Sequence, residues 1–136
     1  MVSSFRNREH AQQLIDFHGI KHGKCSATDI DMSLDWQGKV FVFVEYKWGN
    51  GTLSPGQRYH LENLVNAINA GGKKAIAILA THDTPKGSDV DAGAGMVAKV
   101  YTGRKEGWNR DPAGVTVKTY LDGMYIDFRR GQENAA

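Results

Sequence analysis

Apolar and polar residues alternate along two neighbouring segments of this chain, which is the pattern of β-strands. Residues 27 to 34 alternate so that one set of side chains points to one face, while the other set, which includes Asp29 and Asp31, points to the opposite face. Residues 40 to 47, VFVFVEYK, are apolar on both faces almost to their end, which predicts a strand inside a sheet. The segment DWQG at 35 to 38 predicts a hairpin turn, so the two strands are expected to be antiparallel neighbours.

Helical patterns occupy two other segments. Residues 5 to 18 predict an amphipathic first helix that ends at Gly19. Residues 54 to 57, SPGQ, predict a helix start, with Ser54 as N-cap, proline at the first helical position and Gln57 completing a capping box. Apolar residues then recur at helical spacing, at Leu61, Leu64, Val65 and Ile68. The glycines at 71 and 72 are expected to end this second helix.

Strand signals return after the second helix. Residues 75 to 81, AIAILAT, predict a buried strand parallel to the strand at 40 to 47, because a strand, a helix and a strand in that order favour a right-handed crossover. Beyond a loop at 82 to 95, a closing β-layer of short strands is expected, at 96 to 101, 115 to 121 and 124 to 128. The last residues, GQENAA, are expected to fray. The predicted fold class is therefore α/β (α+β).

Composition places the chain among ordinary globular proteins. Its 136 residues are expected to form a single domain, and the net charge of +2 argues neither for nor against a nucleic-acid partner. The only cysteine, Cys25, excludes an internal disulfide and favours a reducing, cytoplasmic compartment. No run approaches the roughly 18 to 20 apolar residues that span a bilayer, and the N-terminus lacks a signal-peptide pattern. We therefore expect an intracellular protein with no membrane association.

Two charged residues, Glu45 and Lys47, end the apolar strand on one of its faces. Burying charge is costly unless something compensates it. The predicted hairpin allows Asp29 and Asp31 to converge on Glu45, and carboxylates beside a lysine suit a hard divalent cation such as Mg²⁺, with the ammonium group steadying charge on a phosphate. The alternatives are an ion pair at a strand end and, for the aspartates, a solvated strand face.

The run ATDIDMSLDWQGKVFVFVEYKWGNGTLSPGQRYHLENL at 27 to 64 resembles the core of the PD-(D/E)xK nuclease superfamily. Within it, the run is most similar to the virus-type replication-repair (VRR-NUC) nucleases and, more distantly, to Holliday-junction resolvases. The resemblance covers about residues 5 to 81. It implies a restriction-endonuclease-like core of order αβββαβ, with a central mixed sheet flanked by helices. Residues 96 to 128 would form a β-rich extension outside it.

The resemblance also implies roles for individual residues. Asp31, fourteen residues before Glu45, matches the first metal-binding acid of the family, Glu45 matches the second, and Lys47 matches the catalytic lysine. The backbone carbonyl of Tyr46 would complete the metal ligands. Gln57 matches the helix-borne glutamine that lies beside the site in this family.

Three assignments leave alternatives open. Glu9 matches a first-helix acid that helps to hold a second metal ion, but it also fits a solvated helical residue. Ile30 stands where the family has proline, which leaves open whether Asp29 or Asp31 is the main ligand. Gln57 fits equally well as the third residue of a capping box.

The function implied by the resemblance is a Mg²⁺-dependent endonuclease, with Mn²⁺ able to substitute, that hydrolyses DNA phosphodiester bonds by nicking or at branched or junction DNA. One such domain meets one strand, so cleavage of both strands would require a homodimer. A viral or mobile-element origin is also implied. Phosphate contacts or base stacking are expected from Arg58, Arg104, Lys105, Trp108 and Arg110, for which a solvated surface is the alternative.

Two other functions compete with DNA cleavage. A non-catalytic nucleic-acid-binding or assembly module could keep the same core, and an RNA-cleaving enzyme would use the same site. A zinc site at His18, His22 and Cys25 is disfavoured, because the glycines at 19 and 23 interrupt any helix that would align the two histidines.

Overall fold

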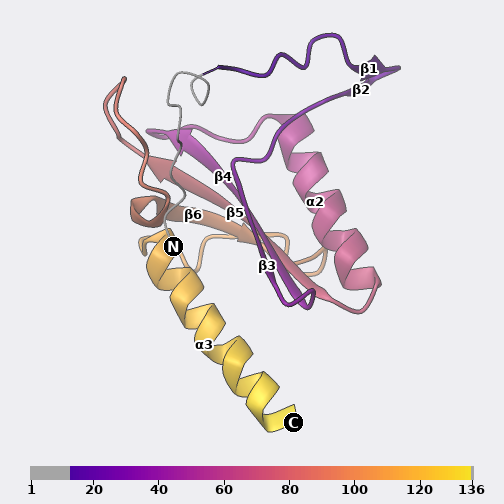
Figure 1. The fold of residues 1–136 in the computed structure, drawn as a ribbon, viewed down its shortest axis with the longest axis vertical. Coiled ribbons are helices and arrows are strands. Elements are labelled where there is room, and N and C mark those ends of the chain that lie inside the picture. The colour runs from indigo at the N-terminus through magenta and orange to yellow at the C-terminus, as the bar shows by residue number, and fades with distance from the viewer. Residues whose placement is uncertain (1–12, 136) are drawn as a thin grey trace.

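A five-stranded mixed sheet of order β3-β4-β5-β6-β7 forms the centre of the molecule (Figure 1). The structure is a computed structural model that describes residues 13–135. Its strands are β1 (Lys21–His22), β2 (Cys25–Ser26), β3 (Met32–Trp36), β4 (Val40–Trp48), β5 (Lys74–His82), β6 (Met96–Tyr101) and β7 (Trp108–Asn109). Its helices are α2 (Pro55–Ala70), the short 3₁₀ helix η1 (Ala92–Ala94) and α3 (Val117–Ala135). The fold is therefore mixed α+β. Within the described part of the chain, neither helix combines the length and apolar character that a membrane crossing needs.

The predicted hairpin and crossover are confirmed. β3 and β4 are antiparallel, with Met32 opposite Val44, and β4 and β5 are parallel, with Glu45 opposite Leu79. β4 is an interior strand because β3 and β5 pair with its two edges. The first strand is shorter than expected: it begins at Met32, so Asp29 and Asp31 lie in the segment that leads into it.

The two long helices cover opposite faces of the sheet (Figure 1). Leu61 and Val65 of α2 pack on one face, and Val117 and Leu121 of α3 pack on the other. β5 lies between both layers, so six consecutive residues, Ala75, Ile76, Ala77, Ile78, Leu79 and Ala80, are buried. Burial on both faces explains why this strand is apolar throughout and does not alternate.

Helix α2 begins as the sequence predicts. The Gln57 backbone N–H donates to Ser54 Oγ at 3.2 Å, and the Ser54 backbone N–H donates to Gln57 Oε1 at 3.3 Å. This reciprocal pair is the predicted capping box, which satisfies two N–H groups that the first helical turn leaves without partners. The helix ends at its C-cap, Gly71.

The C-terminal segment corrects the predicted β-layer. Strand β6 is confirmed, but residues 117–135 form one continuous helix where strands at 115 to 121 and 124 to 128 and a frayed end were expected. The residues of α3 that contact the sheet recur at helical spacing, at Val117, Tyr120, Leu121, Met124 and Phe128. Valine, tyrosine and isoleucine favour strands locally, and the pair Asp122-Gly123 is typical of turns. Packing of this apolar stripe on the sheet outweighs those preferences.

The N-terminal prediction is also corrected where the structure describes it. Residues 1–12, which carry most of the predicted first helix, lie outside the described residues. Residues 13 to 18 are not helical, and Leu14 and Ile15 are exposed. The apolar positions of this part of the segment therefore cover no core, which removes the packing that stabilises an amphipathic helix.

A substitution at Gly123 tests whether the C-terminal segment forms a helix or a turn at this position. Gly123 lies in the interior of α3, its φ is not positive, and an added Cβ would meet nothing within 4 Å. We expect Gly123→Ala to raise the free energy of unfolding by about 0.5–1 kcal/mol, because alanine loses less backbone entropy in a helix. Urea unfolding measures the change.

A matched control for this substitution is Gly38→Ala in the β3–β4 turn. Gly38 also has open space around it, but its φ of 68° belongs to the left-handed region. We expect this variant to be less stable by about 1 kcal/mol. Destabilisation of both variants would contradict a helical Gly123.

Candidate metal centre

Glu45 is the buried acid on which the candidate site is built. Its side chain is on the α2 face of β4, and the residue is only 4% exposed. Strand alternation places Lys47 on the same face and Tyr46 on the opposite one. The charged end of the apolar strand therefore faces the start of α2.

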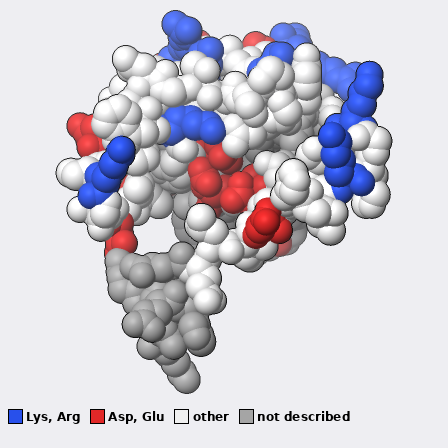
Figure 2. Space-filling model, turned by 90° about the horizontal axis from the view of Figure 1, so that it is seen from above, with Lys and Arg blue, Asp and Glu red and all other residues white. Residues whose placement is uncertain are grey.

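Two aspartates from the segment before β3 meet Glu45. Oxygen atoms of Asp29, Asp31 and Glu45 all lie within 4.8 Å of one another. Asp31 is held in place by the backbone N–H of Tyr46, which donates to Asp31 Oδ2 at 2.8 Å. Figure 2 shows acidic side chains gathered in a hollow on this end of the molecule, with lysine and arginine side chains around it. The predicted convergence of carboxylates is present.

The amide of Gln57 links the acid to the lysine. Its Nε2 donates to Glu45 Oε1 at 3.1 Å, and its Oε1 accepts from Lys47 Nζ at 2.8 Å. The same Oε1 accepts the Ser54 N–H of the capping box. The two readings of Gln57 are therefore compatible, because one side chain caps the helix and bridges the site.

The environment of Glu45 changes its proton affinity. Burial and, next, the neighbouring Asp31 carboxylate together raise the pKa of the Glu45 carboxyl to about 7, while the Lys47 ammonium group opposes the rise. Burial and the charges of Asp31 and Asp91 raise the pKa of Tyr46 to about 12, so its hydroxyl stays protonated. That hydroxyl donates to the backbone carbonyl of Ala92 at 2.8 Å.

The donor set fits a hard divalent cation. All three acids offer carboxylate oxygens, which are the ligands that Mg²⁺ and Mn²⁺ accept, and no sulfur or imidazole belongs to this group within the described residues. The Asp31 carboxylate raises the cost of ionising Glu45, and a bound cation offsets that cost. Asp29 and Asp31 both reach the cluster, so both remain candidate ligands. Glu9 lies outside the described residues, and the role of the Tyr46 carbonyl stays a prediction.

The predicted nucleic-acid contacts are spread over the molecule. Arg58 is on the first turn of α2, where it pairs with Glu62 at 3.6 Å and stacks on Tyr59. Trp108 is half-buried, packs on Tyr101 and donates from Nε1 to Glu62 at 2.7 Å, so its ring belongs to the packing under α2.

The basic loop after β6 lies away from the carboxylates. Arg104 and Lys105 are exposed in this loop, where Asn69 near the end of α2 donates to the Thr102 carbonyl. The carboxylates adjoin the other end of that helix at Gln57, which is twelve residues from Asn69, or about 18 Å along the helix axis. Arg110 is exposed and directly follows the edge strand β7. The structure therefore does not bring these basic residues to the acidic cluster.

Two features beside the cluster were not expected from the sequence. Trp48, directly after Lys47, is 66% exposed. His82, its in-register neighbour on β5, lines two hollows of about 380 and 280 Å³ at this end of the sheet. Lys47 and Trp48 are the last two residues of β4. The sequence signal that could have pointed to Trp48 is an aromatic residue directly after the Glu45-Tyr46-Lys47 motif.

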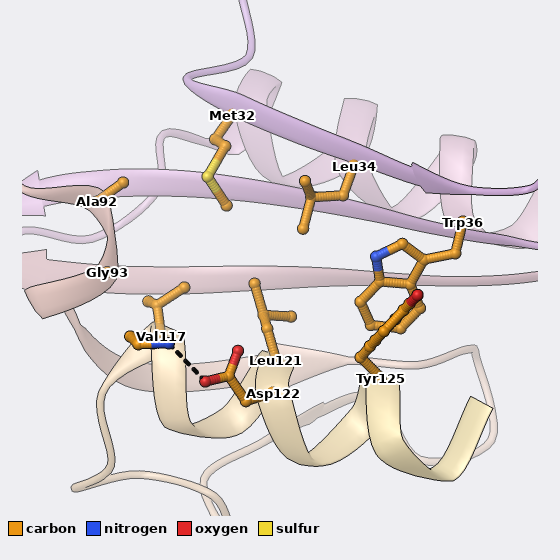
Figure 3. A pocket seen from close by; sticks show the side chains of 10 residues that line it. Met32, Leu34, Trp36, Ala92, Gly93, Val117, Leu121, Asp122 and Tyr125 are labelled. Atoms are coloured by element: carbon orange, nitrogen blue, oxygen red, sulfur yellow. Dashed lines mark hydrogen bonds and ion pairs between the residues drawn. The ribbon is translucent and has the colours of Figure 1, made fainter. Parts of the chain in front are cut away.

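A larger apolar groove lies elsewhere, between the edge strand β3 and α3. It has a volume of about 560 Å³, and Figure 3 shows Met32 and Leu34 pointing toward the helix and Trp36 lying against Tyr125. The rings of Trp36 and Tyr125 are 5.2 Å apart at an angle of 66°. The acids of the candidate centre do not line this groove.

Four of the predicted site residues, Asp31, Glu45, Lys47 and Gln57, thus form one connected group. No model of a known protein family matches the chain, and no curated protein or solved structure matches it. The resemblance to PD-(D/E)xK nucleases therefore stays a prediction that rests on this group and on the residues around it.

Glu45 makes the stability of the metal-free protein depend on pH. Between pH 4.5 and about 7 the folded protein keeps a proton on Glu45 that the unfolded chain has released, so stability falls as pH rises through this window. The expected loss is on the order of 3 kcal/mol. Urea unfolding in EDTA at several pH values measures it.

Glu45→Gln is the comparison for this measurement, because an amide keeps the neutral side chain at every pH. The variant should lose most of the decline between pH 4.5 and 7. Equal slopes in the variant and the wild type would show that another group causes the pH dependence.

Proposed function

We propose that this protein is a metal-dependent endonuclease that hydrolyses phosphodiester bonds in DNA. The observation that carries the proposal is the group formed by Asp31, Glu45, Gln57 and Lys47, in which a buried carboxylate is tied through one amide to an ammonium group. An ion pair kept only for stability gains little over apolar residues at a buried position. A third carboxylate, from Asp29, adds charge that stability alone does not require.

Asp31 and Glu45 would hold the cation, with Asp29 as a further oxygen ligand. When bound, Mg²⁺ or Mn²⁺ supplies a Lewis acid for a phosphate oxygen and lowers the pKa of water. Asp31 is oriented by the Tyr46 N–H, and Glu45 is oriented by the Gln57 amide, so neither acid has to reorganise when substrate arrives.

Lys47 would supply positive charge to the scissile phosphate. Its ammonium group is held 2.8 Å from Gln57 Oε1, at the rim of the acidic cluster. From there it can orient the attacking water or stabilise negative charge that develops on the phosphate. Gln57 touches both Glu45 and Lys47, which makes it a positioning residue for this chemistry.

The fold is compatible with a restriction-endonuclease-like core. An antiparallel hairpin, a helix that starts beside the site and a strand parallel to the second hairpin strand follow one another as β3, β4, α2 and β5. We propose this arrangement for residues up to His82, with a homodimer as the form that cleaves both strands of a duplex or a junction.

Cleavage of nucleic acid tests the proposal. We expect Mg²⁺-dependent nicking of supercoiled plasmid, or cleavage of flap or four-way DNA, that EDTA abolishes. Glu45→Ala and Lys47→Ala should each reduce the rate by about 100-fold or more, because the first removes a ligand of the cation and the second removes positive charge beside the reacting phosphate. A gel assay over a panel of linear and branched substrates measures the rates.

Two substitutions far from the cluster are matched controls for charge. Lys74→Ala changes a lysine at the opposite end of β5, and Asp127→Asn changes an exposed acid of α3. Both should leave cleavage unchanged. Salt-sensitive DNA binding without cleavage of any substrate would replace the proposal with a non-catalytic binding module, and cleavage confined to RNA versions of the panel would change the substrate class.

Metal binding should also appear as stability. At about 100 times its Kd, a cation that binds only the folded protein adds about 2.7 kcal/mol, so Mg²⁺ or Mn²⁺ should raise Tm by several degrees. Glu45→Ala should remove the shift, and Asp127→Asn should keep it. Thermal unfolding with and without EDTA measures this, and an equal shift in Glu45→Ala would place the cation elsewhere.

A further inference from the structure

Trp48 is an exposed aromatic residue at the end of the strand that carries the candidate centre. Its side chain follows Lys47 directly, yet it is 66% exposed, while Trp108, which the sequence suggested as a stacking residue, is half-buried in packing. Strand alternation places this indole on the face of β4 opposite Glu45 and Lys47, where a large exposed ring gains nothing for the core. An exposed indole at this position can stack on a ligand that has a flat apolar face.

The indole is fixed in orientation by a single neighbouring residue. Trp48 Nε1 donates to the backbone carbonyl of Thr84 at 3.2 Å. The backbone N–H of Thr84 in turn donates to His82 Nδ1 at 3.2 Å. Trp48 and His82 are register partners on the parallel strands β4 and β5, so the two rings lie side by side on one face of the sheet. The backbone of Thr84 therefore holds both rings.

The hydrogen bond from the Thr84 N–H to His82 Nδ1 also determines which group His82 offers to a ligand. A ring nitrogen that accepts a hydrogen bond carries no proton, so Nδ1 is the bare nitrogen and Nε2 carries the proton. His82 thus presents a hydrogen-bond donor. The donor suits an oxygen of a phosphate or a sugar.

Two hollows beside His82 connect its ring to the metal centre, and Trp48 is not in the described lining of either. His82 lines one hollow together with Asp31 and Tyr46, and a second hollow together with Asn50 and Thr84. The described lining of both hollows contains neither lysine nor arginine, and the second is also lined by Asp83 and Asp91. Its acids disfavour a phosphate there and suit the neutral base and sugar of a nucleotide.

We infer that Trp48 and His82 form a subsite for one unpaired nucleotide of the substrate strand, across the end of the sheet from Glu45 and Lys47, with the base stacked on the indole and the sugar contacted by His82 Nε2–H. This inference rests on the proposed nuclease function and adds its substrate class. A paired base keeps its faces inside the duplex, so an indole platform selects single-stranded segments, flaps or frayed ends.

Binding measured without cleavage tests the subsite. The probes are a fluorescent thymidine decamer and an abasic decamer with the same phosphates, each titrated in Ca²⁺ with anisotropy as the readout. We expect Trp48→Ala to weaken binding of the thymidine decamer about tenfold and to leave the abasic decamer unchanged, because it removes base stacking alone. Trp48→Phe should keep part of the affinity. His82→Ala should weaken both probes equally, since its contact is with the backbone.

Tyr125→Ala is the matched control, because Tyr125 is another exposed aromatic residue and packs on Trp36 at the far end of β3. It should bind both probes as the wild type does. Equal affinity of Trp48→Ala and the wild type for the thymidine decamer would overturn the subsite. So would an equal loss on both probes, or no binding of the decamer by the wild type. An unchanged His82→Ala would remove His82 from the subsite.

The result is separable from the proposed function. Base-dependent binding through Trp48 in a protein that cleaves nothing would support the subsite and refute the nuclease. Metal-dependent cleavage that requires Glu45 and Lys47, combined with decamer binding that ignores Trp48, would refute the subsite alone.

Discussion

A carboxylate that is 4% exposed on an interior strand is the constraint around which this end of the molecule is organised. Glu45 cannot be buried cheaply, and Asp31 beside it makes ionisation costlier still. The surrounding structure compensates with one amide from α2 and one ammonium from the same strand. Every hydrogen bond of this group depends on the register of β4 and on where α2 begins. The stiff apolar strand is thus the support that fixes the charges.

Helix α2 and the candidate centre share a residue, so folding and chemistry are coupled there. Gln57 completes the capping box with Ser54 and also reaches Glu45 and Lys47. Forming the first turn of the helix therefore sets the amide in the site without a separate loss of side-chain entropy. Tyr46 holds Asp31 through its backbone N–H, and on the opposite face of the sheet its hydroxyl holds the loop before β6. Neighbouring residues of one strand thus organise both sides of the cluster.

Features that depend on residues close together in the chain were predicted correctly, and features that depend on distant contacts were not. The capping box at Ser54, the β3–β4 hairpin and the parallel β4–β5 pair rest on local signals and were predicted correctly. The segment from 115 to 128 was predicted wrongly because its β-favouring residues fit both an alternating and a helical pattern. The apolar residues of α3 favour the helix only when they can pack on the completed sheet. The meeting of Glu45 with Asp31 could be anticipated, since a hairpin makes neighbours of its strands.

The sequence by itself determined that Glu45 and Lys47 share a strand face, where α2 starts, and that Asp31 and Glu45 can meet across a hairpin, because periodicity and capping act over a few residues. Only the tertiary structure decided that one Gln57 amide joins Glu45 to Lys47. It also decided that Trp108 is packed under α2 while Trp48 is exposed, and that Thr84 holds the rings of Trp48 and His82. These contacts join segments distant in the chain, and their geometry depends on how helices and loops pack on the completed sheet.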